Sequence, residues 1–158
     1  MPFDDQYRSL FYAIVFAVHD ISRTELDPQL KLPRFNMPLE LGLFLGAKCY
    51  GGKRQKRKSC KILDTDRYRF QKFCSDIAGQ DISAHGNKIE RVIRAVRDWL
   101  RSCRPAVSIP GGSKITERYY LFKGALPLIC EALHLKEEEL TFLDFQNTLF
   151  EWLKANPW

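Results

Sequence analysis

The stretch that most constrains the fold runs from Phe35 to Lys48 and has the pattern of a helix from its first turn onward. Pro38 suits the first turn, where a missing backbone N–H leaves no hydrogen bond unmade, and Asn36 is a favourable N-cap residue. An apolar stripe at helical spacing follows, formed by Leu41, Phe44 and Leu45. We therefore predict a helix over 37–49, ending before two glycines.

Three residues distinguish this helix from an ordinary core helix. Gly42 and Gly46 lie four residues apart on one face, although each glycine costs a helix about 1 kcal/mol relative to alanine. Glu40 is expected in the first turn, where the helix dipole favours a carboxylate. One interpretation is a charged, ligand-facing carboxylate beside a face that a flat ligand can approach. The other is an acid that only complements the dipole, with glycines that pack against a sheet.

The composition fits a globular chain that contains no membrane span. The 158 residues are 45% hydrophobic, and the net charge of +6 permits an anionic partner without requiring one. The five cysteines are odd in number and scattered, with no metal-ligand spacing, so we expect no metal site and a reducing, cytoplasmic location. The apolar run from Leu10 to Val18 is too short to cross a bilayer.

The first two thirds of the chain read as helices around one clear strand. Apolar residues recur at helical spacing over 5–18, and we predict a buried helix there. Cys60–Asp64 is the clearest strand, 66–77 has a helical pattern, and 79–86 is a turn around a very short strand. Asn87 is expected to cap an amphipathic helix that ends near Cys103. A basic loop, Lys53–Lys58, lies between the helix predicted over 37–49 and this strand, and it is interpreted as solvated.

A linker with prolines and glycines separates this part from the C-terminal end. It covers residues 105–112, so that we predict one domain over 1–104 and another over 113–158. In the second domain, apolar residues recur at alternating spacings of four and three in two segments. This pattern predicts two helices packed as an antiparallel helical hairpin, with Thr141 and Asp144 forming a cap for the second.

The order of motifs in residues 1–103 resembles a known family. A turn with Asp4 is followed by Asp20-Ile21-Ser22, a polar loop and Asn36-Met37-Pro38-Leu39-Glu40-Leu41-Gly42-Leu43. This is similar to the nucleoside 2-deoxyribosyltransferase-like and Toll/interleukin-receptor-like domains of bacterial proteins. The resemblance implies an α/β, Rossmann-like (flavodoxin-like) parallel sheet that binds nucleotides or nucleosides at its carboxyl end. The alternative from the helix-rich pattern is a mainly α fold.

The chain departs from the family pattern before Asp20. In such a fold, a strand, a helix and a second strand should separate the first helix from Asp20-Ile21-Ser22, but Val18-His19 leads directly into it. A βαβ unit needs roughly 30 residues, for which there is no room. The sequence therefore predicts a shortened, helix-rich member of the family.

The resemblance implies cleavage or exchange of an N-glycosidic bond, with Glu40 as the catalytic carboxylate. Breaking this bond develops positive charge on the sugar, which a carboxylate can stabilise or attack. The residues expected to bind substrate are Asp4, Asp20, Ser22, Asn36 and Gly42. Nicotinamide leaves NAD as a neutral molecule, whereas a purine needs an acid, for which Asp20, Asp27 and His85 are candidates. The single carboxylate favours NAD-like substrates.

Three functions remain open on this basis. The first is a nucleotide or nucleoside N-glycosidase, of the type found in bacterial defence or toxin effectors, with no cofactor besides NAD as a candidate substrate. The second is a non-catalytic module that binds a nucleotide or a protein, with the C-terminal hairpin as its interaction element. The third is a truncated, inactive family member. Exposed sheet edges favour a homodimer, while nucleic acid and membranes are not expected as partners.

Overall fold

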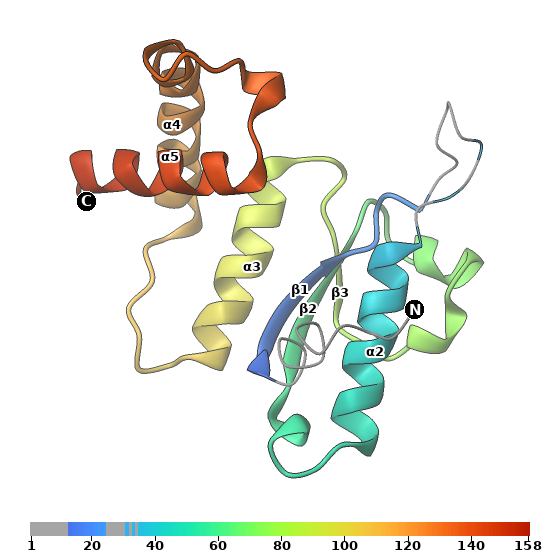
Figure 1. Ribbon diagram of the computed structural model, residues 1–158. Coiled ribbons are helices and arrows are strands. Elements are labelled where there is room, and N and C mark those ends of the chain that lie inside the picture. Colours follow the sequence, from blue (N-terminus) through green and yellow to red (C-terminus); the bar gives the residue numbers. More distant parts are fainter. Residues whose placement is uncertain (1–12, 25–30, 32, 34) are drawn as a thin grey trace. The chain divides into compact units, whose positions relative to one another are not determined.

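The computed structural model describes residues 13–24, 31, 33 and 35–158 (Figure 1). The chain divides into two compact units, residues 1–109 and residues 110–158, and each unit has its own hydrophobic core. The division falls inside the segment 105–112 that the sequence marks as a linker. Asp4 and Asp27, both named as candidate site residues, lie outside the described residues.

A three-stranded parallel sheet forms the centre of the first unit. Its strands are β1 (Phe16–Asp20), β2 (Ser59–Asp64) and β3 (Ile82–Ala84), in the order β1-β2-β3. Phe16 pairs with Ser59 and Ile62 pairs with Ile82, so β2 is hydrogen-bonded on both sides. The prediction of a shortened parallel α/β fold with additional helices is confirmed.

The first strand is where a helix was expected. The helix predicted over 5–18 is wrong at Phe16–Val18, because these residues belong to β1. The apolar run satisfies helical spacing, but a strand buried in a parallel sheet is also continuously apolar, and β-branched and aromatic residues favour the strand. As a result, the strand that ends at Asp20-Ile21-Ser22 is present, and the inferred loss of that strand is also wrong.

Two helices cover opposite faces of this sheet (Figure 1). Helix α2 (Asn36–Tyr50) places Phe44 against His19, with ring centroids 5.4 Å apart. Helix α3 (Ile89–Cys103) places Trp99 against Phe16, with ring centroids 6.1 Å apart. Because side chains alternate along a strand, residues 16 and 19 of β1 point to opposite faces. The predicted α2 is confirmed to within one residue at each end.

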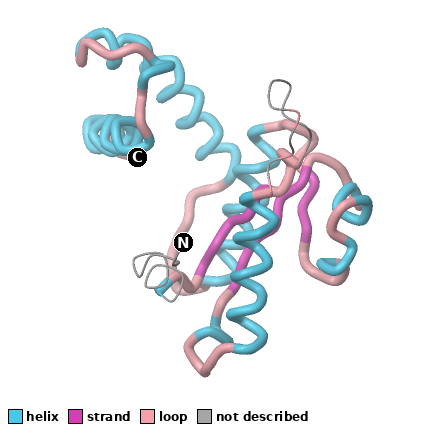
Figure 2. Tube along the Cα trace, turned by 45° about the vertical axis from the view of Figure 1, so that its right-hand side comes forward, coloured by secondary structure: helices cyan, strands magenta, loops and turns pink. Residues whose placement is uncertain are grey.

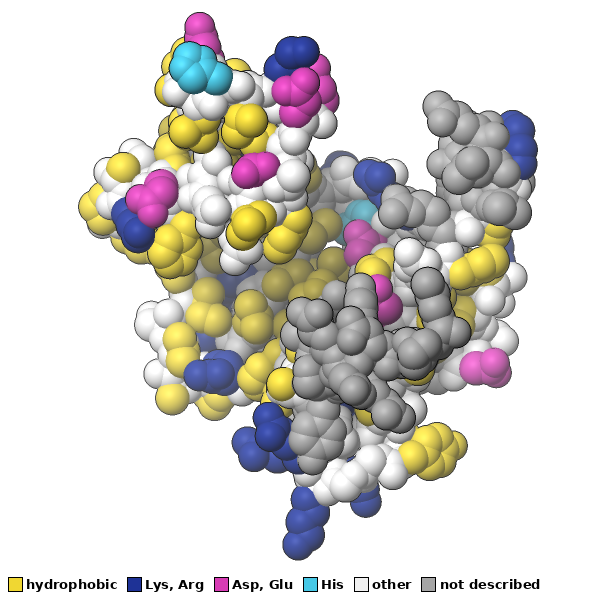
Figure 3. Space-filling view, in the orientation of Figure 1, with side chains coloured by type: hydrophobic (Ala, Val, Ile, Leu, Met, Phe, Trp, Pro, Cys, Tyr) yellow, Lys and Arg dark blue, Asp and Glu magenta, His cyan; other side chains and the backbone are white. Residues whose placement is uncertain are grey.

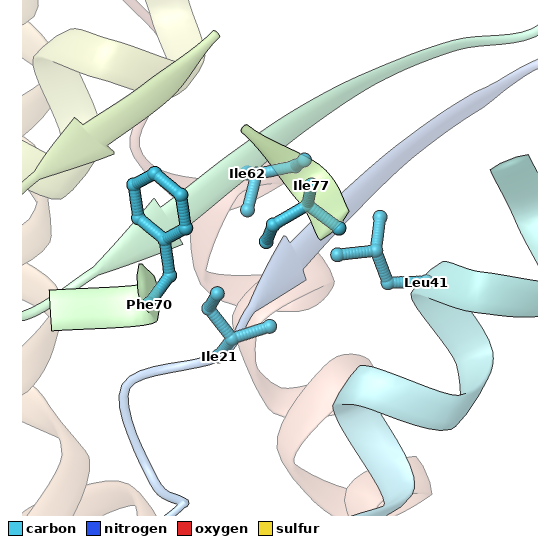
Figure 4. Packing of buried hydrophobic residues seen from close by; sticks show 5 residues of the cluster. All are labelled: Ile21, Leu41, Ile62, Phe70 and Ile77. Carbon is cyan, nitrogen blue, oxygen red and sulfur yellow. The ribbon is translucent and has the colours of Figure 1, made fainter. Parts of the chain in front are cut away.

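The core of the first unit lies between the sheet and α2. Its five buried side chains come from the end of β1, from α2, from β2 and from the segment between β2 and β3, and they point toward one another (Figure 4): Ile21, Leu41, Ile62, Phe70 and Ile77. Truncating a buried leucine such as Leu41 to alanine costs about 2–5 kcal/mol in general. This packing fixes the amino-terminal half of α2 beside the end of β1.

The connection between β2 and β3 is not the helix that its apolar spacing suggests. It contains two short 3-10 helices, Arg69–Lys72 and Ser75–Ile77, joined by irregular backbone (Figure 2). Tyr68 has a φ of 61°, a left-handed conformation that an α-helix cannot continue through. The prediction of a helix over 66–77 is therefore wrong, although Phe70 and Ile77 are buried as the apolar pattern indicates.

The second unit consists of α4 (Gly112–Ala132) and α5 (Phe142–Ala155), with a short 3-10 helix at Glu137–Glu139 between them. Phe122 is central to its core, with ring centroids 5.6 Å from Phe145 and 5.5 Å from Trp152. Both predicted helices are present, but α5 crosses α4 instead of running alongside it (Figures 1 and 2). Among the described residues, no helix is both long and apolar enough to cross a membrane.

Candidate functional site

Polar side chains gather where the three parallel strands end. Asp20 is the last residue of β1, Asp64 is the last residue of β2, and His85 follows β3 directly. In open parallel α/β sheets, ligands bind outside the carboxyl ends of the strands. We name the set formed by Asp20, Ser22, Asp64, Arg69 and His85 the carboxyl-edge cluster.

Asp64 and Arg69 form the rigid base of the carboxyl-edge cluster. The Asp64 side chain has no exposed surface, and its Oδ1 accepts hydrogen bonds from Arg69 Nε and from the backbone N–H of Thr65, each at 2.7 Å. The second oxygen, Oδ2, is buried and has no hydrogen-bond partner among the described residues. An ionised acceptor without a partner is costly to bury, so a ligand or water that donates a hydrogen bond here would be stabilised.

Arg69 also ties the end of β2 to the loop that follows β1. Its Nη2 donates to the carbonyl oxygens of Ile21 and Ser22, at 2.9 and 2.8 Å, and to Oγ1 of Thr24 at 3.1 Å. The guanidinium also lies 5.0 Å from the ring centroid of Phe73. Since one side chain fastens three residues of this loop, the position of Ser22 depends on Arg69.

Asp20 projects from the same loop with one oxygen engaged. Its Oδ1 accepts the backbone N–H of Ser22 at 3.0 Å, the geometry of an Asx turn. Its side chain is 46% exposed, so the carboxylate can reach a ligand from solvent. The carboxylate of Asp20 is therefore the solvent-accessible one of the carboxyl-edge cluster, while that of Asp64 is fully buried.

His85 is buried beside Asp20, held by the end of the sheet. Its backbone N–H donates to the carbonyl of Asp64 at 2.9 Å, which extends the β2–β3 ladder by one residue. Its Nδ1 accepts the backbone N–H of Asn87 at 3.1 Å, so in the neutral ring the proton is on Nε2. That Nε2 lies 3.6 Å from Oδ1 of Asp20, and it has no hydrogen-bond partner in the described parts of the chain.

This tautomer limits what His85 can do chemically. A neutral imidazole that donates through Nε2–H can bind an acceptor such as a carbonyl, a hydroxyl or a phosphate oxygen. Acting as a general acid would require the imidazolium form, in which Nδ1–H would face the Asn87 N–H, donor against donor. His85 is therefore arranged as a hydrogen-bond donor, and its geometry disfavours the acid role that was one candidate from the sequence.

Glu40 lies on α2, which begins at this edge of the sheet. Because α2 starts at Asn36, Glu40 is beyond the first turn, and the expectation of a first-turn carboxylate is wrong. The side chain is half-buried and forms no hydrogen bond or ion pair with a described residue. Its neighbour Leu41 packs against Ile21, the residue after β1, so this part of α2 is anchored next to the carboxyl-edge cluster.

The other residues predicted on α2 are exposed. Asn36 is the first helical residue, Phe35 holds the N-cap position, and no side chain caps the helix, so the predicted N-cap role of Asn36 is wrong. A Cβ built at Gly42 or Gly46 would meet no atom within 4 Å among those described. The interpretation that the glycines pack against the sheet is therefore wrong, because all three strands of the sheet lie within the described residues.

A polar cavity of about 340 Å³ lies beside the carboxyl-edge cluster, between the segments that leave β2 and enter β3. Among its lining residues are Asp66, Tyr68, Gln80 and Ala84. The described residues contain no group of three or more His, Cys, Asp or Glu side chains that could hold a metal ion.

Sequence reasoning placed Asp20 and Ser22 in the candidate site but missed Asp64 and Arg69. The available signal was an aspartate at the end of the clearest strand, with an arginine five residues later in a segment that had to turn back toward the sheet. Helical spacing in 66–77 concealed this signal, because it placed Arg69 on the surface of an expected helix.

These features define the chain's class: an α/β protein with a short parallel sheet, a polar cluster at its carboxyl edge and a separate helical unit. No protein-family model, curated protein or solved structure matches the chain.

Proposed function

We propose that residues 1–109 bind a nucleotide or nucleoside at the carboxyl-edge cluster and cleave its N-glycosidic bond with the help of Glu40. The observation that carries the proposal is the buried Nε2–H of His85, which lacks a partner in the described chain and lies 3.6 Å from Asp20. A donor and an acceptor side by side suit vicinal hydroxyls such as those of a ribose. The family resemblance supplies the reaction type.

The chemistry follows from the groups that are present. The C1′–N bond breaks with its electron pair on the leaving base, and Glu40 stabilises the positive charge that develops on the sugar. Water then adds its oxygen to C1′ and loses a proton to solvent. Because His85 is arranged as a donor and not as an acid, a base that leaves without protonation is favoured. Nicotinamide meets this requirement, so NAD is the proposed substrate.

The test compares base release by the parent chain, by Glu40→Gln and by Glu131→Gln. Glu131 is an exposed glutamate of the second unit, so its replacement makes the same chemical change far from the proposed site in sequence. Each protein is incubated with NAD and with a panel of nucleosides, and free base is followed by chromatography. We expect the parent and Glu131→Gln to release nicotinamide, and Glu40→Gln to lose this activity while its thermal melt is unchanged.

Equal activity in Glu40→Gln would exclude Glu40 as the catalytic carboxylate. Release of purine or pyrimidine bases at the same rate as nicotinamide would exclude the substrate preference derived from His85. These two outcomes are independent, because the first concerns the sugar and the second concerns the leaving base.

A second candidate function is binding without turnover, and the second unit favours it. A cavity of about 620 Å³ lies in that unit and is lined mainly by apolar side chains, including Ile129, Leu133 and Trp152. Two large apolar side chains of the same unit, Leu128 and Phe142, are 70% and 81% exposed. For the form of this candidate that binds a nucleotide in the first unit, calorimetry that detects saturable NAD binding to a chain that releases no base would be the supporting result.

The third candidate, an inactive relic, predicts a chain without a cooperative thermal transition. The two hydrophobic cores argue for a folded protein.

All five cysteines are free thiols, which supports the proposal of a reducing, cytoplasmic location.

A further inference from the structure

The basic loop, residues 53–58, has an ordered arrangement that separates its side chains into two sets. Gln55 and Lys58 are buried, with 6% and 2% of their surface exposed. Lys53, Arg54, Lys56 and Arg57 are exposed. The interpretation of the whole loop as solvated is therefore wrong for two of its six residues, and the buried pair fixes where the four exposed cations lie.

Several contacts hold the loop in one conformation. Lys58 donates through Nζ to the carbonyl of Ile14, and this Nζ also lies 4.7 Å from the ring centroid of Phe44. Backbone hydrogen bonds of 3.0–3.2 Å close successive turns at Lys56, Arg57 and Lys58. Gly51 is required before these turns, because a Cβ there would lie 2.4 Å from the carbonyl oxygen of Ala47.

Three of the four exposed cations line a concave surface. A cavity of about 440 Å³ is lined by Lys53, Arg54, Arg57 and Val15. Val15 directly precedes β1 and the loop directly precedes β2, so the cavity lies at the amino edge of the sheet, opposite the carboxyl-edge cluster. Figure 3 shows Lys and Arg side chains gathered at the lower end of the view, where Figure 1 places the turn between α2 and β2.

Three of the four exposed cations of the basic loop are not paired with an acidic side chain of the described residues. Lys53, Lys56 and Arg57 form no ion pair with any described residue. Like charges held close together repel one another, so a polyanion that neutralises them would be bound favourably. An aromatic side chain is available as well, because Tyr50, the last residue of α2, is 90% exposed.

We propose that the basic loop is a binding site for the phosphate backbone of a single-stranded nucleic acid. A concave surface lined by cations accepts phosphates that project from a strand, whereas a flat membrane surface would touch only the rim. Tyr50, three residues before Lys53 in sequence, adds an exposed aromatic ring on which a base can stack, as in sites that bind single strands. This site is separate from the carboxyl-edge cluster and does not depend on the proposed glycosidase activity.

The test uses the full-length chain and a fluorescein-labelled single-stranded oligothymidylate, with oligouridylate as the RNA equivalent. Binding to single strands depends on salt with a logarithmic slope of about −0.7 for each phosphate neutralised, so four cations give about −2.8. We expect the affinity of the parent, measured by anisotropy, to fall about 50-fold between about 50 and 200 mM salt.

Two triple variants, each of which removes three positive charges, show whether binding depends on the basic loop or only on the net charge of the protein. The loop variant replaces Lys53, Lys56 and Arg57 with glutamine. The control variant replaces three exposed cations elsewhere in the unit, Lys72, Arg94 and Arg104, with glutamine. We expect the loop variant to lose most binding at low salt and to reach a slope of about −0.7, and the control variant to keep the slope of the parent.

Three results would overturn the proposal: an unchanged salt slope in the loop variant, an equal loss in the control variant, or binding of the parent to phosphatidylserine vesicles but to neither oligonucleotide. The last result would assign the basic loop to a membrane surface. Because all six positions are exposed, both variants are expected to keep the thermal midpoint of the parent, which is checked before binding is measured.

Discussion

Arg69 Nε and Asp64 Oδ1 lie 2.7 Å apart, and the carboxylate belongs to a side chain with no exposed surface at the end of the central strand. The same guanidinium holds the carbonyl oxygens of Ile21 and Ser22. One buried ion pair therefore connects the end of β2 to the loop after β1. Arg69 is therefore a positioning residue for Ser22. The contribution of the Arg69–Asp64 ion pair to the stability of the first unit can be measured.

We predict that Arg69→Met destabilises the first unit by about 3–5 kcal/mol, because it leaves the Asp64 carboxylate buried without its partner. Arg69→Lys should lose less, since it keeps the charge but not the planar set of donors. The free energy of unfolding is followed through amide hydrogen exchange of β2, which reports on this unit alone.

The exposed pair of Arg97 and Asp98 provides the control. Its atoms are 3.0 Å apart, but the Asp98 side chain is 59% exposed, so Asp98→Asn should cost no more than about 1 kcal/mol. An Arg69→Met chain as stable as Asp98→Asn would contradict the structural role of the buried pair.

The stability of the first unit should also depend on His19. This histidine is buried against Phe44, and burial lowers its pKa from the usual value of 6.5. The unfolded chain therefore binds a proton more readily than the folded chain below about pH 6.5. The free energy of unfolding should fall as the pH drops through this range, by at most about 1.4 kcal/mol per pH unit from this group.

His19→Leu should remove this part of the pH dependence, as measured by hydrogen exchange of β2 between about pH 7.5 and 5. The control is His134→Leu, at an exposed position in the second unit. If the slope of stability against pH in His19→Leu equals that of the parent, the histidine is not buried in its neutral form.

The sequence predicts an element of the fold where its pattern fits only one kind of secondary structure, and it fails where the pattern fits both a helix and a strand. Helix α2 was found because proline, spacing and two terminal glycines agree. Strand β1 was missed because the continuous apolar run around Phe16 satisfies both a helix and a buried strand, and only pairing with Ser59 of β2 selects the strand. That pairing spans more than 40 residues and has no local signal.

The site was predicted in part for a related reason. Asp20 and Ser22 were proposed from a short motif, and they lie at the edge of the sheet where parallel strands end. His85 was named as one candidate acid, but its tautomer depends on the Asn87 N–H, which spacing cannot reveal. Arg69 was missed because its contacts lie up to 48 residues away in sequence. The roles of Glu40 and Gly42 remain predictions.

Cysteine reactivity should distinguish an exposed thiol from a partly buried one. Burial raises the pKa of Cys60, and nearby Lys48 offsets this only in part, whereas Cys49 is exposed on α2. Because the thiolate is the reactive form, we predict that iodoacetamide modifies Cys49 well before Cys60 in the folded chain. Mass spectrometry of digests taken over time gives the order. Equal rates in the folded chain, as expected in denaturant, would contradict the partial burial of Cys60.

The turn that positions His85 depends on the backbone conformation of Asn87. Asn87 has a φ of 55°, a left-handed conformation, and it donates its backbone N–H to Nδ1 of His85. It does not cap α3 as expected from the sequence, since Lys88 holds the N-cap position without a side-chain hydrogen bond. The contact with His85 therefore depends on the left-handed backbone conformation of Asn87 and not on the Asn87 side chain.

Two replacements of Asn87 distinguish the contribution of its backbone conformation to stability from that of its side chain. Asn87→Gly should be tolerated, because glycine adopts a positive φ freely, whereas Asn87→Val should cost about 1–2 kcal/mol. Both keep the N–H, so nitrogen NMR of the imidazole should report the Nε2–H tautomer of His85 in the parent and in the glycine variant. A glycine variant as unstable as the valine variant would assign the effect to the Asn87 side chain. A proton on Nδ1 in the parent would remove the reason for treating His85 as a hydrogen-bond donor toward the ligand.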